Sequence, residues 1–231
     1  LADWVIAHKR MMLGLGLVLT IGGASAVTLN RFGDDYVKFF NQDHPFRLAT
    51  EFTNDRLTGM QYLEYVVDAG VEGGALEPEF LHRMDRFADW LRQQPEVRKV
   101  SSIIGVLESL NQAMNADDPA FYRIPDGREE AAQYVLLYEL SLPSGVDLTH
   151  LLNLDKSAAR MTVQLDTISS EAIRLFDDRA RAWQSEHLPE TEAIRGAGVS
   201  IMFAHIARRN FASMLWGTMI AFALIIALLY F

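Results

Sequence analysis

Two long runs without a charged side chain, one near each end of the chain, limit what this sequence can fold into. Residues 11–29 and 211–231 contain no Asp, Glu, Lys, Arg or His. Each run is close to the ~20 apolar residues that a helix needs to cross a hydrocarbon core of ~30 Å. We therefore expect two membrane-spanning helices that flank residues 30–210, which are polar enough to form a water-soluble domain.

The ends of the chain extend this interpretation. The sequence begins on Leu1 rather than on Met, and it ends inside the second apolar run. We expect an N-terminal piece of a larger polytopic membrane protein. An alternative is a cleaved signal peptide ending at residues 24–26, but the first run is longer than the ~7–15 residues of a signal-peptide core.

The orientation in the membrane follows from basic residues and from loop length. Lys9 and Arg10 precede the first run, and basic residues favour the cytoplasmic side, which predicts a cytoplasmic segment 1–10. Long loops cross the membrane largely regardless of their charge. We therefore expect residues 30–210 to lie outside the cytoplasm, between two spans.

Composition excludes several functions. The formal net charge is −9 and the chain contains no Cys. An acidic surface repels phosphate backbones, so nucleic acid is not an expected partner. Without Cys there are no disulfides, no thiolate chemistry and no cysteine metal site.

The segment between the runs alternates strand and helix patterns. In the stretch 159–165, apolar and polar residues alternate, as in a strand with one buried face. Phe80, Met84, Phe87 and Leu91 recur at helical spacing between Pro78 and Gln94. Further strands are expected at 60–67, 97–103 and 192–199, and further helices at 104–115, at 129–142 and after Ser169 or Ser170. Two β-α-β units predict an α+β, two-layer sandwich of the ferredoxin-like kind.

The sequence shows no convincing catalytic, cofactor or metal motif, and we do not expect an enzyme. The pairs Asp85/Asp89 and Asp177/Asp178 lie among arginines. Paired carboxylates perform acid–base chemistry only where burial or repulsion shifts their pKa values, so we interpret both pairs as solvated helix faces with ion pairs. The six His residues are scattered. We expect no catalytic residue, no bound cofactor and no metal.

Aromatic residues lie next to the expected membrane boundaries. Tyr36, Phe39 and Phe40 follow the first run, and Phe203 and His205 precede the second. Aromatic side chains near a span are typical of an interfacial anchor. The alternative is one wall of a lipid-accessible cleft, and His205 near the membrane is a candidate proton-sensitive contact.

The order of several segments, together with the two apolar runs, resembles the MMPL branch of the resistance-nodulation-division (RND) transporters. The resemblance covers nearly the whole chain, although no single motif is diagnostic. The segments are Glu72-Gly73-Gly74 with residues 78–81, then residues 95–100, 111–115, 117–125, 132–139, 196–199 and 203–205.

The resemblance implies a multi-pass exporter of lipids or other hydrophobic molecules in the bacterial inner membrane, driven by the proton motive force, with residues 30–210 in the periplasm. This chain would supply its first porter domain, with Tyr36, Phe39, Phe40, Phe203 and His205 as candidates for the substrate path. Implied partners are membrane lipid or a hydrophobic substrate, the rest of the same transporter chain and, in a homo-oligomer, further copies of it. Neither run contains an ionisable residue, so we expect the proton relay outside this chain. Alternatives are a two-span receptor or sensor with an extracytoplasmic ligand domain, and a membrane-anchored envelope enzyme.

Overall fold

The computed structural model describes residue 4 and residues 8–27, 36–57, 59–188 and 194–230. The chain divides into two compact units, Leu1–Asp34 and Asp35–Phe231. In the first unit, the expected apolar run forms helix α2, Lys9–Val27. This 19-residue helix carries Lys9 and Arg10 in its first turn and includes four glycines.

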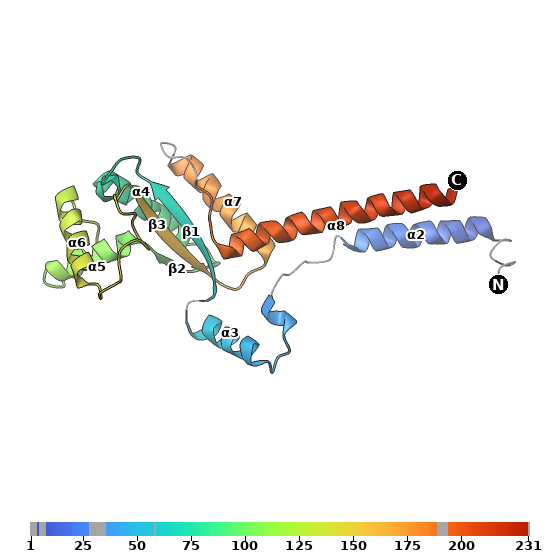
Figure 1. Ribbon diagram of the computed structural model, residues 1–231, viewed down its shortest axis with the longest axis horizontal. Coiled ribbons are helices and arrows are strands. Elements are labelled where there is room, and N and C mark those ends of the chain that lie inside the picture. Colours follow the sequence, from blue (N-terminus) through green and yellow to red (C-terminus); the bar gives the residue numbers. More distant parts are fainter. Residues whose placement is uncertain (1–3, 5–7, 28–35, 58, 189–193, 231) are drawn as a thin grey trace. The chain divides into compact units, whose positions relative to one another are not determined.

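The second unit is an α+β domain built on a small antiparallel sheet (Figure 1). Its strands are β1 (Gln61–Asp68), β2 (Val97–Ser101) and β3 (Ala158–Leu165). They lie in the order β1-β3-β2, with β3 antiparallel to both neighbours. Leu63 and Val100 both pair with Val163, one on each side of the central strand.

Helices occupy most of the remaining described chain. The helices expected from about 78 to 94, at 104–115, at 129–142 and after Ser169 or Ser170 are all present. A short 3-10 turn η1 (Tyr36–Phe39) precedes helix α3 (Pro45–Arg56), and the sequence patterns did not predict this helix. Two further 3-10 turns are η2 (Gly74–Leu76) and η3 (Pro119–Phe121). The α-helices of this unit are α3 (Pro45–Arg56), α4 (Pro78–Arg92), α5 (Ile103–Met114), α6 (Arg128–Ser141), α7 (Ser170–His187) and α8 (Val199–Tyr230).

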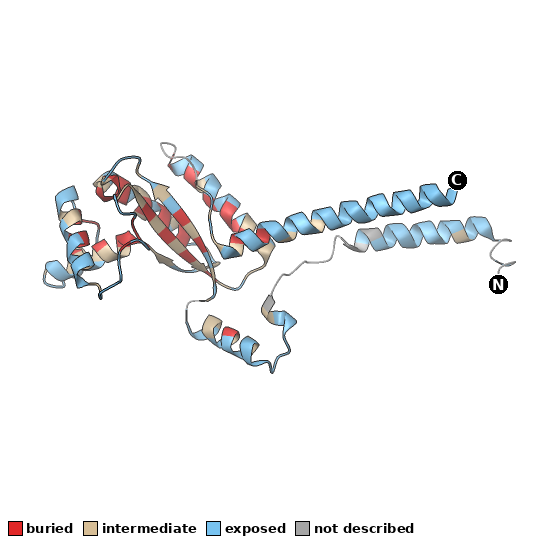
Figure 2. Ribbon diagram, in the orientation of Figure 1, coloured by how far each residue is buried: buried red, intermediate tan, exposed pale blue. Residues whose placement is uncertain are grey.

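The core lies on one face of the sheet. The residues of β3 alternate between buried and half-buried, as their sequence predicts. Tyr65 of β1 meets the ring of Phe87 on α4, edge to face at 5.4 Å between centroids, and donates a hydrogen bond to Asp177 on α7. Both helices therefore cover the same face, and Figure 2 shows the buried residues concentrated there. On the opposite face Arg160 pairs with Glu64 at 3.6 Å.

The predicted strand at 192–199 is wrong in the part that the structure describes. Residues 192 and 193 lie outside the described residues, and Ala197 forms only an isolated antiparallel bridge to Glu64 of β1. Side chains of α7 form hydrogen bonds with the neighbouring backbone groups instead. Gln184 bonds both the N–H and the carbonyl of Ile194, and Asp177 accepts from the Gly196 N–H. Pairing ends at Gly198, where φ is +119° and α8 begins.

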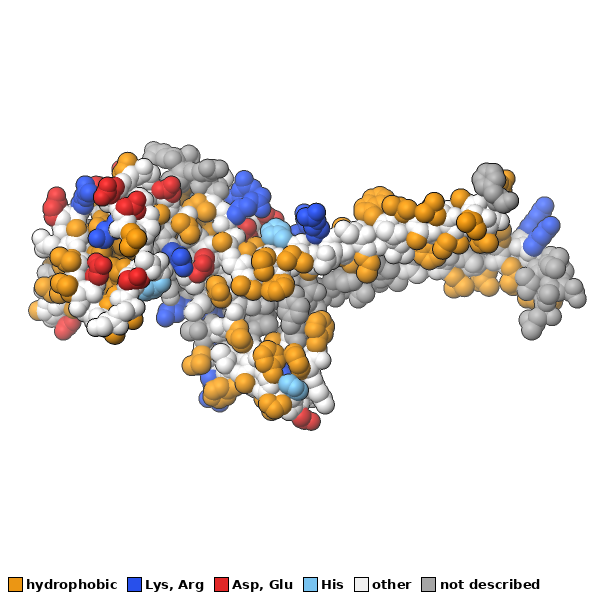
Figure 3. All heavy atoms as spheres, in the orientation of Figure 1, with side chains coloured by type: hydrophobic (Ala, Val, Ile, Leu, Met, Phe, Trp, Pro, Cys, Tyr) orange, Lys and Arg blue, Asp and Glu red, His pale blue; other side chains and the backbone are white. Residues whose placement is uncertain are grey.

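Helix α8 runs without a break from the edge of the sheet into the second apolar run. Its first turns belong to the domain: Ile201 and Ala204 are buried, and the Ser200 hydroxyl accepts from the Tyr62 N–H. Among the described residues it is the one helix that is long and apolar enough to cross a membrane. Its hydrophobic side chains lie exposed along its length (Figure 3).

Candidate functional site

The first group of candidate path residues lies in and beside η1. Phe39 is 74% exposed and Phe40 is 40% exposed. The Phe40 ring lies against His44 and Phe46 at the start of α3, with centroids 4.8 and 5.0 Å apart. Tyr36 belongs to η1, but its side chain is outside what the structure describes. Phe39 at the end of η1 and Phe40 just after it therefore both leave part of their ring surface exposed.

The second group lies in the first turns of α8, among the residues that hold this helix to the domain. Phe203 is 41% exposed and His205 is also exposed. They flank Ala204, which is buried, so both side chains point away from the core. In the described part of the chain, neither the cavity of about 1000 Å³ nor that of about 320 Å³ is lined by Phe39, Phe40, Phe203 or His205.

The interpretation of Asp177 and Asp178 as a solvated pair is wrong for Asp177. It is 2% exposed, whereas Asp178 is exposed. Its carboxylate accepts from the Tyr65 hydroxyl at 3.1 Å and from the Gly196 N–H at 2.6 Å. Burial, and next the charge of Asp177, raises the pKa of Tyr65 far above its usual range, so the hydroxyl stays a donor. Asp177 therefore ties the chain ahead of α8 to strand β1.

A cavity of about 1000 Å³ opens between α4, β2, α5 and α6. Its lining combines charged side chains, such as Arg92, Lys99 and Glu108, with the rings of Tyr122 and Tyr138. The sequence patterns did not predict this cavity, because its lining residues come from segments that converge only in the fold.

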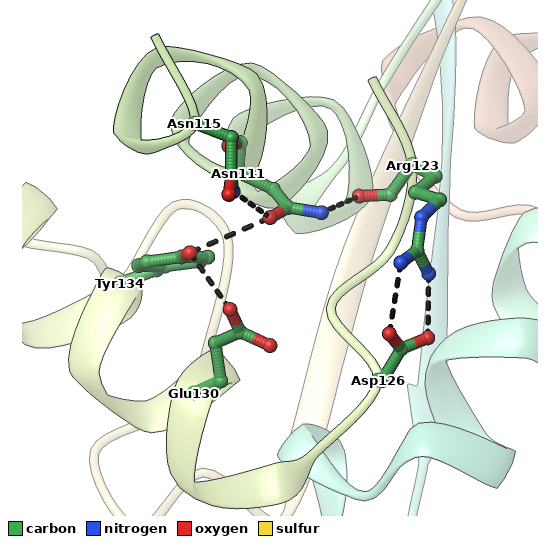
Figure 4. Close-up of polar contacts among 6 residues, drawn as sticks. All are labelled: Asn111, Asn115, Arg123, Asp126, Glu130 and Tyr134. Atoms are coloured by element: carbon green, nitrogen blue, oxygen red, sulfur yellow. Dashed lines mark hydrogen bonds and ion pairs between the residues drawn. The ribbon is translucent and has the colours of Figure 1, made fainter. Parts of the chain in front are cut away.

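A polar network fixes the helices that wall this cavity (Figure 4). Asn111 of α5 is buried, and its side-chain amide donates to the Arg123 carbonyl at 2.9 Å. The Tyr134 hydroxyl on α6 donates to Glu130 at 2.9 Å and lies 3.4 Å from the Asn111 carbonyl oxygen. Arg123 is in turn paired with Asp126. These bonds hold α5, α6 and the connection between them in one arrangement.

Carboxylates of α4 and α5 meet beside the cavity. Arg92 lies 2.7 Å from Asp89 and 3.7 Å from Asp85, which confirms the interpretation of that pair as ion-paired. Glu108 on α5 was not anticipated. Burial, and next the charge of Asp85, raises the pKa of Glu108 to about 7, although Arg92 opposes this. Burial, followed by Asp89, also raises the pKa of Asp85. The Glu108 carboxyl group is therefore partly protonated near neutral pH.

These groups define what the domain can bind. In the described part of the chain, no three His, Asp or Glu side chains are placed to hold a metal ion. The cavity instead offers hydrogen-bond donors, one titrating carboxyl group and aromatic rings. No protein-family model matches this chain, and no curated protein matches it.

Proposed function

We propose that this chain is the first part of an inner-membrane exporter of the RND superfamily, MMPL branch, driven by the proton motive force. In this proposal α2 and α8 are its first two spans, and residues 30–210 form its first periplasmic porter domain. Its substrate is a lipid or another hydrophobic molecule. The proton relay belongs to spans outside this chain, because neither apolar run contains an ionisable residue.

The observation that carries the proposal is the continuity of α8. One helix of 32 residues begins at the sheet edge and continues into an uncharged apolar stretch. Arg208 and Arg209 lie at the junction and are exposed, where their charged groups can reach water and lipid phosphates. Such a helix connects a folded domain to a membrane without a flexible linker, as a transporter needs when the two parts move together.

The sheet order supports a ferredoxin-like porter domain. Strand β3 lies between β1 and β2, which α4 connects. Strand β1 lies in the same way between β3 and the bridge at Ala197, which α7 connects. Two interleaved β-α-β units of this kind are the pattern of the split β-α-β fold.

The exposed aromatics support a hydrophobic substrate. Phe39, Phe40 and Phe203 leave apolar surface in water, at a cost of ~25 cal/mol for each Å² that a lipid would cover. All three lie next to expected membrane boundaries in the sequence. In this proposal, a lipid that leaves the bilayer along the domain contacts these rings.

Labelling of single cysteines tests the topology of this proposal, and the Cys-free chain gives no background. We expect Glu72→Cys and Leu154→Cys, both at exposed positions, to react with a membrane-impermeant maleimide on intact spheroplasts. His8→Cys should react only after permeabilisation. The reverse pattern, or labelling of all three from one side, would contradict a periplasmic domain between two spans.

A further inference from the structure

Helix α3 carries its apolar side chains on the outside of the domain. Its exposed residues include Phe46, Leu48, Ala49 and Phe52. Of these, Phe52 is 63% exposed. A helix on the surface of a water-soluble domain normally buries its apolar side and exposes its polar side. Figure 3 shows hydrophobic side chains gathered over this helix.

The polar side of α3 faces the domain instead. Thr50 is 5% exposed, and Glu51 and Asn54 are half-buried. A cavity of about 320 Å³ lies on this side, and its lining includes Glu51 and Asn54 of α3, Arg98 of β2 and Asp166. The Arg98 guanidinium donates to the Asn54 carbonyl and pairs with Asp166. These bonds hold α3 with its polar side inward, which leaves the apolar side outward.

The ring of Phe40 extends the apolar side of α3. It lies against Phe46, with centroids 5.0 Å apart. Arg47 of α3 donates to the Phe40 carbonyl at 3.1 Å and so holds the two segments together. We call the exposed surface of these residues the α3 apolar face, and it consists of Phe40, Phe46, Leu48, Ala49 and Phe52. An exposed apolar surface rimmed by polar groups is typical of a protein or membrane contact.

Helices α3 and α8 meet the sheet at the same end. Strand β1 begins at Gln61, beside the last residue of β3. Arg98, which bonds both α3 and Asp166 just after β3, holds α3 at this end. Helix α8 begins beside Tyr62, whose N–H donates to the Ser200 hydroxyl. The helix that continues into the apolar run therefore starts where α3 is attached.

The connection ahead of η1 is short. Residues 28–35 alone separate α2 from η1. Eight residues extend at most ~30 Å. Because α2 is a span in the proposed function, this connection keeps η1, and α3 after it, within reach of the bilayer surface. A lipid surface is therefore the partner that the chain itself brings to the α3 apolar face.

We propose that α3 lies on the outer surface of the lipid bilayer that α8 enters, with the α3 apolar face in contact with lipid. Helices of this kind bury their apolar side about 5–10 Å into the boundary between headgroups and acyl chains. Arg56, exposed at the end of the helix, can extend its guanidinium to lipid phosphates. This position of α3 rests on the proposed function, because it requires α8 to be a span.

Lipid quenching at three matched alanine positions tests the position of α3, on the full chain in nanodiscs of phosphatidylethanolamine and phosphatidylglycerol. The chain has no Cys, so each variant carries a single nitrobenzoxadiazole label. The variants are Ala49→Cys in the α3 apolar face, Ala221→Cys in α8 and Ala113→Cys at an exposed position on α5. We expect a nitroxide near the lipid headgroup to quench the label at Ala49, and one near the acyl-chain end to quench the label at Ala221. Neither lipid should quench the label at Ala113.

The outcomes separate the position of α3 from the proposed function. Quenching at Ala221 but not at Ala49 would overturn the position of α3 and leave the span in place. Quenching at Ala49 but not at Ala221 would support a helix on the membrane surface and contradict the span. Shielding of Ala49 from water without lipid quenching, found only in nanodiscs that hold two chains, would assign the α3 apolar face to a second copy and overturn the proposal.

A charge within the α3 apolar face tests the contact directly. Phe52→Asp should lower the quenching at Ala49 about threefold, because a carboxylate at the acyl-chain boundary is costly. Phe52 is exposed, so the unfolding midpoint should stay unchanged. Leu136→Asp on α6, also at an exposed apolar position, is the matched control and should leave the quenching at Ala49 unchanged. Equal quenching in Phe52→Asp and in Leu136→Asp would contradict the proposed contact.

Discussion

Asp177→Ala should destabilise the domain by roughly 3 kcal/mol, a large part of the 5–15 kcal/mol typical of a folded domain. The substitution removes the acceptor of two groups, the buried Tyr65 hydroxyl and the Gly196 N–H. Each unpaired buried donor costs about 1–3 kcal/mol. Chemical unfolding of the full chain in detergent, followed by tryptophan fluorescence, measures the loss. Trp90 and Trp183 report on it, because their stacked rings lie 5.5 Å apart between α4 and α7.

The neighbouring residue provides the matched control. Asp178→Ala makes the same chemical change at an exposed position, so we expect a change within about 0.5 kcal/mol. Tyr65→Phe should fall between the two variants, because it removes one donor and leaves the bond from Gly196 in place. Equal losses for Asp177→Ala and Asp178→Ala would show that the buried network does not hold this part of the fold.

Asn210→Pro should break α8 between the domain and the apolar run. Asn210 lies inside the 32-residue helix, directly after Arg208 and Arg209. Proline removes one N–H bond and clashes with the preceding turn, at a cost of ~3 kcal/mol in a helix interior. Spin labels at Ser185→Cys on α7 and Thr218→Cys on α8 measure the effect as a distance distribution.

For the unbroken helix we expect one narrow distance distribution, and for Asn210→Pro a broad or shifted one. Asn210→Ala keeps the helix and should keep the narrow distribution. A broad distribution in the starting chain would show that the domain and the apolar part of α8 move independently. That result would remove the observation on which the proposed coupling rests.

Elements with strong periodicity could be predicted from the sequence. The stripe of Phe80, Met84, Phe87 and Leu91 is buried in α4, and the alternation in β3 gives one buried face. These patterns predict the elements correctly because the side of each helix or strand that faces the core carries apolar residues. They do not fix the arrangement of the strands, which depends on contacts between distant segments.

The errors have physical reasons as well. Asp177 and Asp178 look alike in sequence, but Asp177 is buried and accepts a hydrogen bond from Tyr65, whereas Asp178 is exposed. The segment before α8 resembles a strand, yet side chains of α7 bind its backbone. Helix α3 has little apolar periodicity. Its signals were Pro45 in the first turn and His44, which caps it by accepting from the Phe46 N–H.

The candidate site was only partly accessible to sequence analysis. The exposed aromatics could be named because their place beside an apolar run is visible in sequence. The charge state of the cavity depends on Glu108, whose raised pKa arises from burial and from carboxylates on α4. A lone Glu in a helical pattern carries no such signal.

Photo-crosslinking in cell membranes tests the central claim, that hydrophobic molecules pass along the membrane-proximal aromatics. Benzoylphenylalanine would replace Phe39, Phe40 or Phe203, one at a time, in the protein expressed from its native gene. Leu136 and Leu140 on α6 are the matched controls, because they are also exposed and apolar. We expect lipid adducts at all three phenylalanine positions and none at the two leucines. Adducts at Phe39 and Phe40 alone would indicate an interfacial anchor, and adducts confined to α6 would contradict the proposed path.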